Sequence, residues 1–159
     1  MEIEKMRMDL GSAAENITSL IEGNINIASK TKLQDLNILL VDDDSFTLDV
    51  VTSSLYQLGI TNVESTDSAL QALEFVKEQG HFIDVLLCDL NMPGMNGIEF
   101  FSELASTDYK GNIAIITGAS NTTISMAELL ADIDGIQVLG TLKKPATREE
   151  LSILLSEAL

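Results

Sequence analysis

Expected strands alternate with expected helices from Asn37 to the end of the chain, and this alternation limits the fold more than any other feature. The segments expected to form strands are residues 38–41, 62–65, 83–88, 113–117 and 136–143. The first of them is apolar on both faces, which is typical of a strand inside a parallel sheet. Five strands alternating with five helices predict an α/β fold, a doubly wound five-stranded parallel sheet with helices on both faces.

Residues with short oxygen-bearing side chains indicate where the helices begin. Asp44 or Ser45 is expected to cap the first helix. Thr66 or Asp67 is expected to cap the second. Thr147 opens a Thr-Arg-Glu-Glu sequence, which predicts a capping box at the start of the last helix.

The first 36 residues differ from the rest, so we expect residues 37–159 to form the α/β domain and residues 1–36 to be a helical extension and connector. Apolar residues spaced by three and four form one helical seam with coiled-coil character, namely Ile3, Met6, Leu10, Ala13, Ile17 and Leu20. Two interpretations stay open. The segment packs on its own domain or frays in solution, or it serves as a docking arm or as the dimerisation helix of a homodimer.

Polar side chains follow four of the expected strands at the point where each strand ends. Asp42–Asp44 follow the first strand and Asp89 ends the third. Thr117 ends the fourth strand, and Lys144 ends the fifth. Because the carboxyl ends of parallel strands meet at one edge of a sheet, we expect these groups to converge there, where ligands bind in such folds.

This set of groups suits phosphoryl transfer assisted by a metal ion. Clustered carboxylates are costly unless a cation neutralises them, and a site lined by oxygen atoms suits Mg²⁺. Phosphoryl transfer depends mainly on positioning and charge neutralisation, which Mg²⁺ and Lys144 would supply. Asp89 would act as the carboxylate nucleophile, and Thr117 would donate a hydrogen bond to a phosphoryl oxygen.

At these positions the sequence resembles the receiver domains of two-component response regulators, such as the chemotaxis regulators. The stretches that carry the resemblance are Ile38-Leu39-Leu40-Val41-Asp42-Asp43-Asp44, Asp89-Leu90-Asn91-Met92-Pro93-Gly94-Met95-Asn96-Gly97, Ile115-Ile116-Thr117-Gly118 and Leu142-Lys143-Lys144-Pro145. The resemblance runs from about Leu36 to the C-terminus. It implies a flavodoxin-like strand order of 2-1-3-4-5.

The resemblance also implies the metal ligands. Asp43 would bind Mg²⁺ directly and Asp42 mainly through water. Asp89 and the backbone carbonyl of Asn91 would complete the protein ligands.

The resemblance further implies how the domain is phosphorylated and switched. Asp89 would accept a phosphoryl group from a sensor histidine kinase or phosphotransfer protein, and Lys144 would pair first with Asp89 and then with the phosphoryl group. Thr117 would be the switch hydroxyl, with Gly118 leaving it room to move. Such a domain catalyses only its own phosphorylation and dephosphorylation, and it acts on a downstream output domain or partner protein.

Three features depart from the usual receiver pattern, and the N-terminal extension described above is one of them. Thr141 occupies the position three residues before the conserved lysine, where the family usually has Tyr or Phe. The usual coupling of a buried aromatic rotation to Thr117 is therefore in doubt. The stretch from Thr117 to Lys144 is also longer than is common by about one helical turn, so we expect the helix between them, or its flanking loops, to be altered.

Charge and hydropathy exclude several classes of function. The formal net charge is −16, which repels a phosphodiester backbone, so we expect no direct contact with nucleic acid. No apolar run reaches transmembrane length, and the N-terminus lacks the pattern of a signal peptide. We therefore expect a cytoplasmic protein without membrane contact.

Among the remaining polar residues, we expect Cys88 to pack in the core, and His81 and Lys143 to be solvated.

Two other functions compete with that of a phosphoacceptor. A haloacid-dehalogenase-like phosphatase also forms an aspartyl phosphate, but it has Thr or Val where this chain has Phe46. A receiver-like interaction module that works without phosphorylation would not need the full acidic set. The stretch Leu139–Pro145 has a faint resemblance to receivers joined to cyclic-di-GMP phosphodiesterase domains, which leaves the output open.

Overall fold

The computed structural model describes residues 32–159, and the expected helical seam at residues 3–20 lies outside the described residues. The elements in chain order are η2 (Leu33–Asp35), β1 (Asn37–Val41), α2 (Ser45–Gln57), β2 (Asn62–Thr66), α3 (Ala69–Gln79), η3 (Gly80–Phe82), β3 (Val85–Cys88), α4 (Gly97–Ala105), β4 (Asn112–Thr117), α5 (Asn121–Ile133), β5 (Val138–Lys143) and α6 (Arg148–Ser156).

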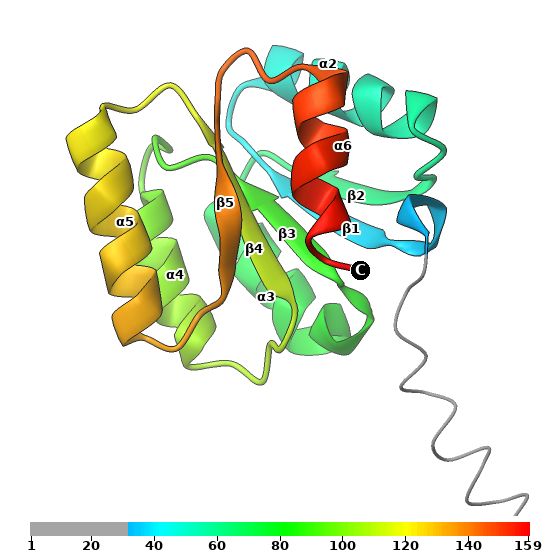
Figure 1. The fold of residues 1–159 in the computed structure, drawn as a ribbon. Coiled ribbons are helices and arrows are strands. Elements are labelled where there is room, and N and C mark those ends of the chain that lie inside the picture. Colours follow the sequence, from blue (N-terminus) through cyan, green and yellow to red (C-terminus); the bar gives the residue numbers. More distant parts are fainter. Residues whose placement is uncertain (1–31) are drawn as a thin grey trace, which may run out of the picture.

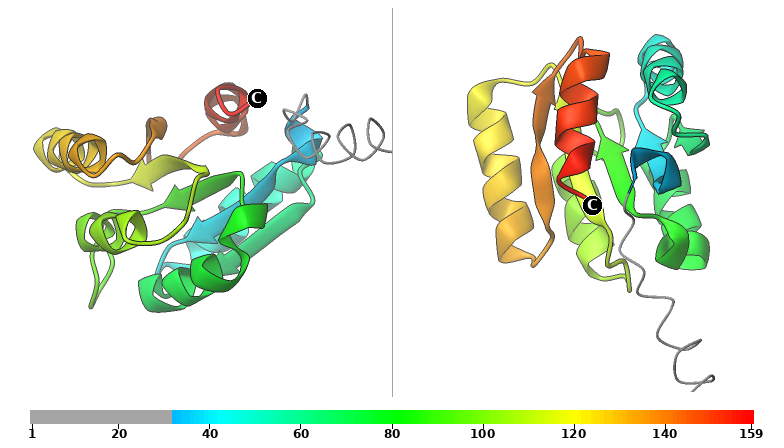
Figure 2. Two further views of the ribbon diagram at one scale, coloured as in Figure 1. Left: turned by 90° about the horizontal axis from the view of Figure 1, so that it is seen from below. Right: turned by 45° about the vertical axis from the view of Figure 1, so that its right-hand side comes forward.

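The five strands form one parallel sheet in the order β2-β1-β3-β4-β5, which confirms the predicted architecture and strand order. Figure 1 and Figure 2 show the strands side by side, with helices packed on both sides of them. Because every strand points the same way, all five carboxyl ends lie along one edge of the sheet. That edge carries the polar residues discussed below.

Alternating side chains of the central strands build two apolar cores, one on each face of the sheet. In β1, Leu39 and Val41 face the core formed with α3, α4 and α5. Ile38 and Leu40 face the core formed with α2 and α6. All four side chains are at most 2% exposed, and full burial of one such side chain contributes about 1.5–3 kcal/mol. The strand is therefore apolar on both faces, as its sequence predicts.

Two of the three predicted helix N-caps are confirmed, and one is wrong. Asp44 caps α2 by accepting a hydrogen bond from the backbone amide of Phe46 at 3.1 Å. The predicted capping box of α6 is present. The prediction for α3 is wrong, because Ser68 and neither Thr66 nor Asp67 caps it. Thr66 is still part of β2, and its hydroxyl accepts from the amide of Ser68 at 3.2 Å.

Two strands begin later than predicted. β3 begins at Val85, since Asp84 turns its carboxylate back to accept from the backbone amide of Asn37 at 2.7 Å. β5 begins at Val138, and its pairing with β4 is irregular directly afterwards, because Ile113 pairs with Val138 but Ala114 pairs with Gly140. Leu139 is thus an extra residue in β5. It places every later side chain of that strand on the opposite face of the sheet from the one it would occupy without the bulge.

No helix in residues 32–159 combines the length and apolar character needed to cross a membrane.

Candidate functional site

The sheet places two buried carboxylates next to each other at its carboxyl edge. Asp42 follows β1 and Asp89 follows β3, and the last residues of these paired strands, Val41 and Cys88, are register partners. The amide of Asp89 donates to the carbonyl of Val41 at 3.0 Å, which extends this pairing to the site itself. Asp42 is 2% exposed and Asp89 is 4% exposed. Parallel pairing of β1 and β3 thus fixes the separation of the two acids.

Asp43 adds an exposed carboxylate to this pair. One carboxylate oxygen from each of Asp42, Asp43 and Asp89 lies within 4.8 Å of the other two. Three oxygen donors at this spacing fit a hard divalent cation such as Mg²⁺. The residues present therefore suit the metal that receiver domains bind in their acidic pocket. Asn91, whose backbone carbonyl is a predicted ligand, follows in the β3–α4 loop and is exposed.

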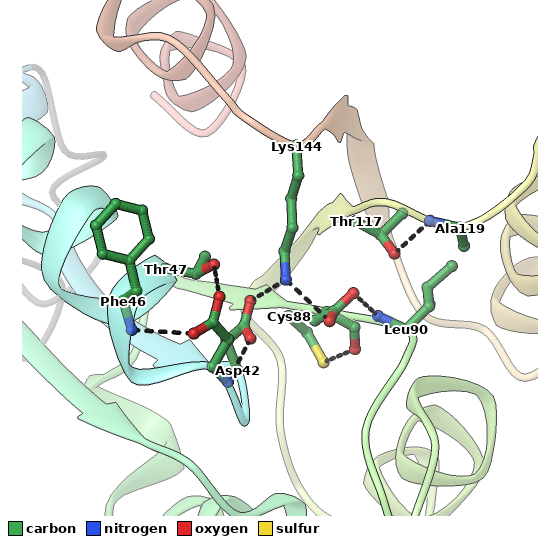
Figure 3. A network of polar contacts seen from close by, with 10 residues as sticks. Asp42, Phe46, Thr47, Cys88, Leu90, Thr117, Ala119 and Lys144 are labelled. Carbon is green, nitrogen blue, oxygen red and sulfur yellow. Dashed lines mark hydrogen bonds and ion pairs between the residues drawn. The ribbon is translucent and has the colours of Figure 1, made fainter.

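Lys144 provides the cation that joins the two buried acids. Its Nζ atom lies 2.6 Å from Oδ2 of Asp42 and 3.0 Å from Oδ2 of Asp89. Its backbone amide donates to the carbonyl of Thr117 at 3.0 Å, which ties the end of β5 to the end of β4. Figure 3 shows the Lys144 side chain extending towards Asp42 from the β5 side. Asp42, Asp89 and Lys144 therefore meet as the sequence predicts.

The protonation equilibria reflect competition between burial and charge pairing. Burial raises the pKa of Asp42 and outweighs the opposing hydrogen bonds from Lys144 and the amide of Asp44. For Lys144 burial favours the neutral amine, but its hydrogen bonds with Asp42 and Asp89 are stronger in sum and raise its pKa. Lys144 is therefore a firmly charged ammonium group, whereas Asp42 carries its charge at a cost that an added cation would reduce.

Thr117 ends β4 and is fully buried. Its hydroxyl oxygen accepts a hydrogen bond from the backbone amide of Ala119 at 3.2 Å. Figure 3 shows Thr117 on the opposite side of Lys144 from Asp42. The predicted switch hydroxyl is thus at the same edge of the sheet, held by the turn that leads into α5.

The β3–α4 loop approaches the site closely at a glycine. A Cβ atom at Gly97 would lie 2.7 Å from the Cα of Leu90 and 2.8 Å from the carbonyl oxygen of Asp89. Gly97 also donates its amide to the carbonyl of Leu90 at 2.9 Å. Gly94 has a φ of +84°, which favours glycine. Gly97 thus has no room for a side chain because the loop folds back onto Asp89 and Leu90, whereas Gly94 needs glycine for its backbone conformation.

Three polar contacts near the site were not predicted. Lys143 is exposed, as expected, but its Nζ also donates to the carbonyl of Ala119. Thr141 donates its hydroxyl to Oε1 of Glu128 on α5 at 2.7 Å. Cys88 packs in the core as predicted, but its Sγ also lies 3.0 Å from the carbonyl oxygen of Asp89. Residues 141 and 143 are two apart in a strand, so their side chains are expected to lie on the same face of the sheet. Whether that face is the one covered by α5 depends on the bulge at Leu139, which the sequence does not reveal.

Comparison with known proteins identifies the family. Residues 38–156 match the response regulator receiver domain. The chain belongs to that family. Chemotaxis protein CheY-3 of Vibrio cholerae is 30% identical over 118 residues, which cover 74% of this chain and 87% of CheY-3. The receiver domain protein of Clostridium thermocellum superposes with a TM-score of 0.66 at 28% identity, covering 77% of this chain and 93% of that protein.

Other relatives carry the receiver as part of a longer protein. The cyclic di-GMP phosphodiesterase RocR of Pseudomonas aeruginosa is 30% identical over 129 residues, which cover 78% of this chain and 31% of RocR. Across four of the curated relatives, the chain spans between 14% and 31% of their length. The chain is a receiver domain of the two-component response regulator type, and neither the phosphatase nor the phosphorylation-independent module is favoured.

Proposed function

We propose that Asp89 accepts a phosphoryl group from a sensor histidine kinase or a phosphotransfer protein. The observation that carries this proposal is the position of the Lys144 ammonium between Asp42 and Asp89. Oδ1 of Asp89 accepts from the amide of Leu90 at 2.7 Å, and Oδ2 accepts from Lys144 at 3.0 Å. This buried carboxylate is therefore held in one orientation beside a cation, as an attacking group must be.

The proposed metal ligands are the carboxylates of Asp42, Asp43 and Asp89 and the backbone carbonyl of Asn91. Mg²⁺ bound there would neutralise the acids and the phosphoryl oxygens and hold the phosphoryl group in line with the attacking oxygen. Asp43 is the exposed member of the acidic set, so it is the one that an incoming hydrated ion meets first.

The proposed transfer is a nucleophilic displacement at the phosphorus atom. An oxygen lone pair of Asp89 forms a bond to phosphorus while the bond from phosphorus to the donor's imidazole nitrogen breaks, and its electron pair stays on that nitrogen. Lys144 then pairs with the phosphoryl oxygens, which carry a charge of about −1.5 to −2 in place of the carboxylate charge of Asp89, and Thr117 donates a hydrogen bond to a phosphoryl oxygen. Dephosphorylation is a separate step, in which water attacks phosphorus, the bond to Asp89 breaks, and inorganic phosphate, the free carboxylate and one proton released to solvent result.

The partners follow from this chemistry. A domain that catalyses only its own phosphorylation and dephosphorylation needs a phosphorylated donor and a target that reads its state. We propose that the target is a downstream output domain or a separate partner protein. The similarity to RocR supports an output through a cyclic-di-GMP phosphodiesterase domain as one arrangement.

We also propose that residues 1–36 act as a helical extension that pairs two copies of the chain. The support is the apolar seam in their sequence. Deleting residues 1–30 is expected to reduce the molecular mass in solution from that of a dimer to that of a monomer, as measured by light scattering. An unchanged monomer mass before and after the deletion would remove this proposal.

The phosphoacceptor proposal is tested by loading the protein with acetyl phosphate and Mg²⁺ and locating the added group by mass spectrometry. Wild-type protein is expected to gain one phosphoryl group on Asp89, and Asp89→Ala none. Asp108→Ala is the matched control, because Asp108 is an exposed acid in the loop before β4. Loading of Asp89→Ala at another residue would contradict the assignment.

A further inference from the structure

The turn between β4 and α5 holds the hydroxyl of Thr117 through a single backbone amide. That amide belongs to Ala119, which is 6% exposed and lies two residues after Thr117. The residue between them is Gly118, and a Cβ atom there would meet no other atom within 4 Å. Packing holds the Ala119 side chain in the core on the α5 side of the sheet, but the Gly118 backbone before it is not packed, and a glycine leaves that backbone free to rotate. A polar contact at the Ala119 peptide would therefore help to fix the direction of its amide.

Lys143 supplies that contact from the neighbouring strand. Its Nζ donates to the carbonyl of Ala119, so the same residue is bound at its carbonyl by Lys143 and at its amide by Thr117. Thr117 and Lys143 are register partners in the β4–β5 pairing. Paired residues in adjacent strands point to the same face of the sheet. The Lys143 side chain thus runs beside Thr117 towards the entry of α5.

The bulge in β5 explains why Lys143 faces this way. Before the extra residue Leu139, Val138 pairs with Ile113, and after it Thr141 pairs with Ile115. Ile113 and Ile115 both belong to the core under α5. The bulge therefore brings the row of Thr141 and Lys143 onto the α5 side of the sheet. Both members of the row are hydrogen-bonded there, Thr141 to Glu128 and Lys143 to Ala119.

Lys143 and Lys144 have separate partners although they are adjacent in sequence. Lys144 pairs with Asp42 and Asp89. Within residues 32–159 Lys143 forms no ion pair with a carboxylate. Its hydrogen bond to the Ala119 carbonyl is thus the contact that defines its position. Lys144 is thus the lysine that pairs with the acids of the site, whereas the contact of Lys143 with a backbone carbonyl fits an orienting role.

We infer that Lys143 is a positioning residue for phosphoryl transfer, which acts by holding Ala119 so that the Thr117 hydroxyl keeps its orientation. This inference rests on the proposed phosphorylation of Asp89. In the described arrangement, the Ala119 amide occupies a lone pair of the Thr117 oxygen, which leaves the hydroxyl proton free for a phosphoryl oxygen. Without the Lys143 contact, the Gly118 turn loosens and the hydroxyl is oriented for only part of the time.

The test is a double-mutant cycle on the rate of phosphorylation by acetyl phosphate with Mg²⁺. Lys143→Met is expected to lower this rate by about three- to tenfold, the usual effect of losing one hydrogen bond. Lys143→Arg is expected to recover most of it, because the guanidinium group also donates. In a Thr117→Ala background, Lys143→Met is expected to have little further effect, since the hydroxyl it orients is gone.

Other outcomes distinguish this inference from its alternatives. A loss that is equally large in the Thr117→Ala background would mean that Lys143 acts by its charge, and would overturn the inference. A Lys143→Met rate equal to wild type would also overturn it. Lys110→Met is the control for loss of a surface lysine, because Lys110 is exposed before the start of β4, at the opposite edge of the sheet. If wild-type protein is not loaded at all, the phosphoacceptor proposal itself fails.

Discussion

The Nζ atom of Lys144 lies 2.6 Å from Oδ2 of Asp42, a shorter distance than the 3.0 Å that separates it from Oδ2 of Asp89. The sequence resemblance implies pairing with Asp89 and then with the phosphoryl group. The structure adds a second carboxylate, so one ammonium group compensates two acids that are both nearly inaccessible to water. An arriving phosphoryl group would therefore compete with Asp42 for this lysine.

Lys144→Met is expected to destabilise the protein in metal-free buffer by about 2 kcal/mol. Removing one partner of a buried ion pair typically costs about 3–5 kcal/mol, and the partial exposure of Lys144 reduces this figure. Urea unfolding with and without MgCl₂ measures the effect. We expect Mg²⁺ to stabilise the variant more than wild type, because the ion replaces the lost positive charge. A metal-free stability equal to that of Lys110→Met would count against the role assigned to Lys144.

The fold and the acidic pocket could be predicted because they depend on local patterns and one rule of topology. Apolar runs of strand length alternate with helices, and parallel strands must end at a shared edge. Asp42 and Asp89 each follow such a run directly, so their meeting follows from sheet register without knowledge of any loop. Lys144 could be placed in the same way, since it follows β5 immediately.

The contacts on the α5 side of β5 could not be predicted for a physical reason. A one-residue bulge reverses which face a strand residue occupies, and the sequence Val-Leu-Gly-Thr carries no unambiguous sign of one. The sequence therefore predicts the exposure of Lys143 but not its hydrogen bond to Ala119. The cap of α3 was wrong for a similar reason, because Thr66, Asp67 and Ser68 are all good caps and the length of β2 decides among them.

Asp43→Ala is expected to abolish Mg²⁺ binding in calorimetry while leaving metal-free stability unchanged or slightly raised. Asp43 is exposed, so its removal leaves no buried group unpaired and lowers the repulsion within the acidic set. Wild-type protein is expected to gain stability as MgCl₂ is added, since a ligand that binds only the folded state shifts the unfolding equilibrium. Asp108→Ala should respond like wild type. Unchanged Mg²⁺ affinity in Asp43→Ala would contradict the proposed ligand set.

Thr141→Val is expected to lower the free energy of unfolding by about 1 kcal/mol, the typical loss when a hydrogen bond is removed and its partner remains. Valine has nearly the same shape but cannot donate to Glu128, whose Oε1 lies 2.7 Å from the Thr141 hydroxyl. Urea denaturation of Thr141→Val, Glu128→Met and the double variant separates this contact from other effects, because Met keeps the length of the side chain but has no oxygen to accept the bond. If the two single changes add without coupling, the hydrogen bond does not contribute to stability.

We expect the buried phenol of Tyr109 to make the protein less stable in alkaline solution. Its hydroxyl donates to the carbonyl of Asn112 at 2.9 Å, and burial together with the charge of Asp84 holds the pKa of this phenol well above its usual range. An unfolded tyrosine ionises near pH 10, so above that pH the folded state binds more protons than the unfolded state. The unfolding free energy then falls as pH rises, by up to about 1.4 kcal/mol per pH unit for this one group.

Tyr109→Phe tests this expectation because it removes the ionisable hydroxyl and keeps the ring. At neutral pH the variant is expected to be less stable than wild type by about 1 kcal/mol, through loss of the bond to Asn112. Above pH 10 the difference should shrink and then reverse, since only wild type carries the buried phenol. The raised pKa of Lys144 acts in the same direction near this pH, but it is common to both proteins and cancels in the difference. Urea unfolding of the pair from pH 8 to pH 11 measures this; a constant difference across that interval would mean that Tyr109 ionises with equal ease in the folded and unfolded states.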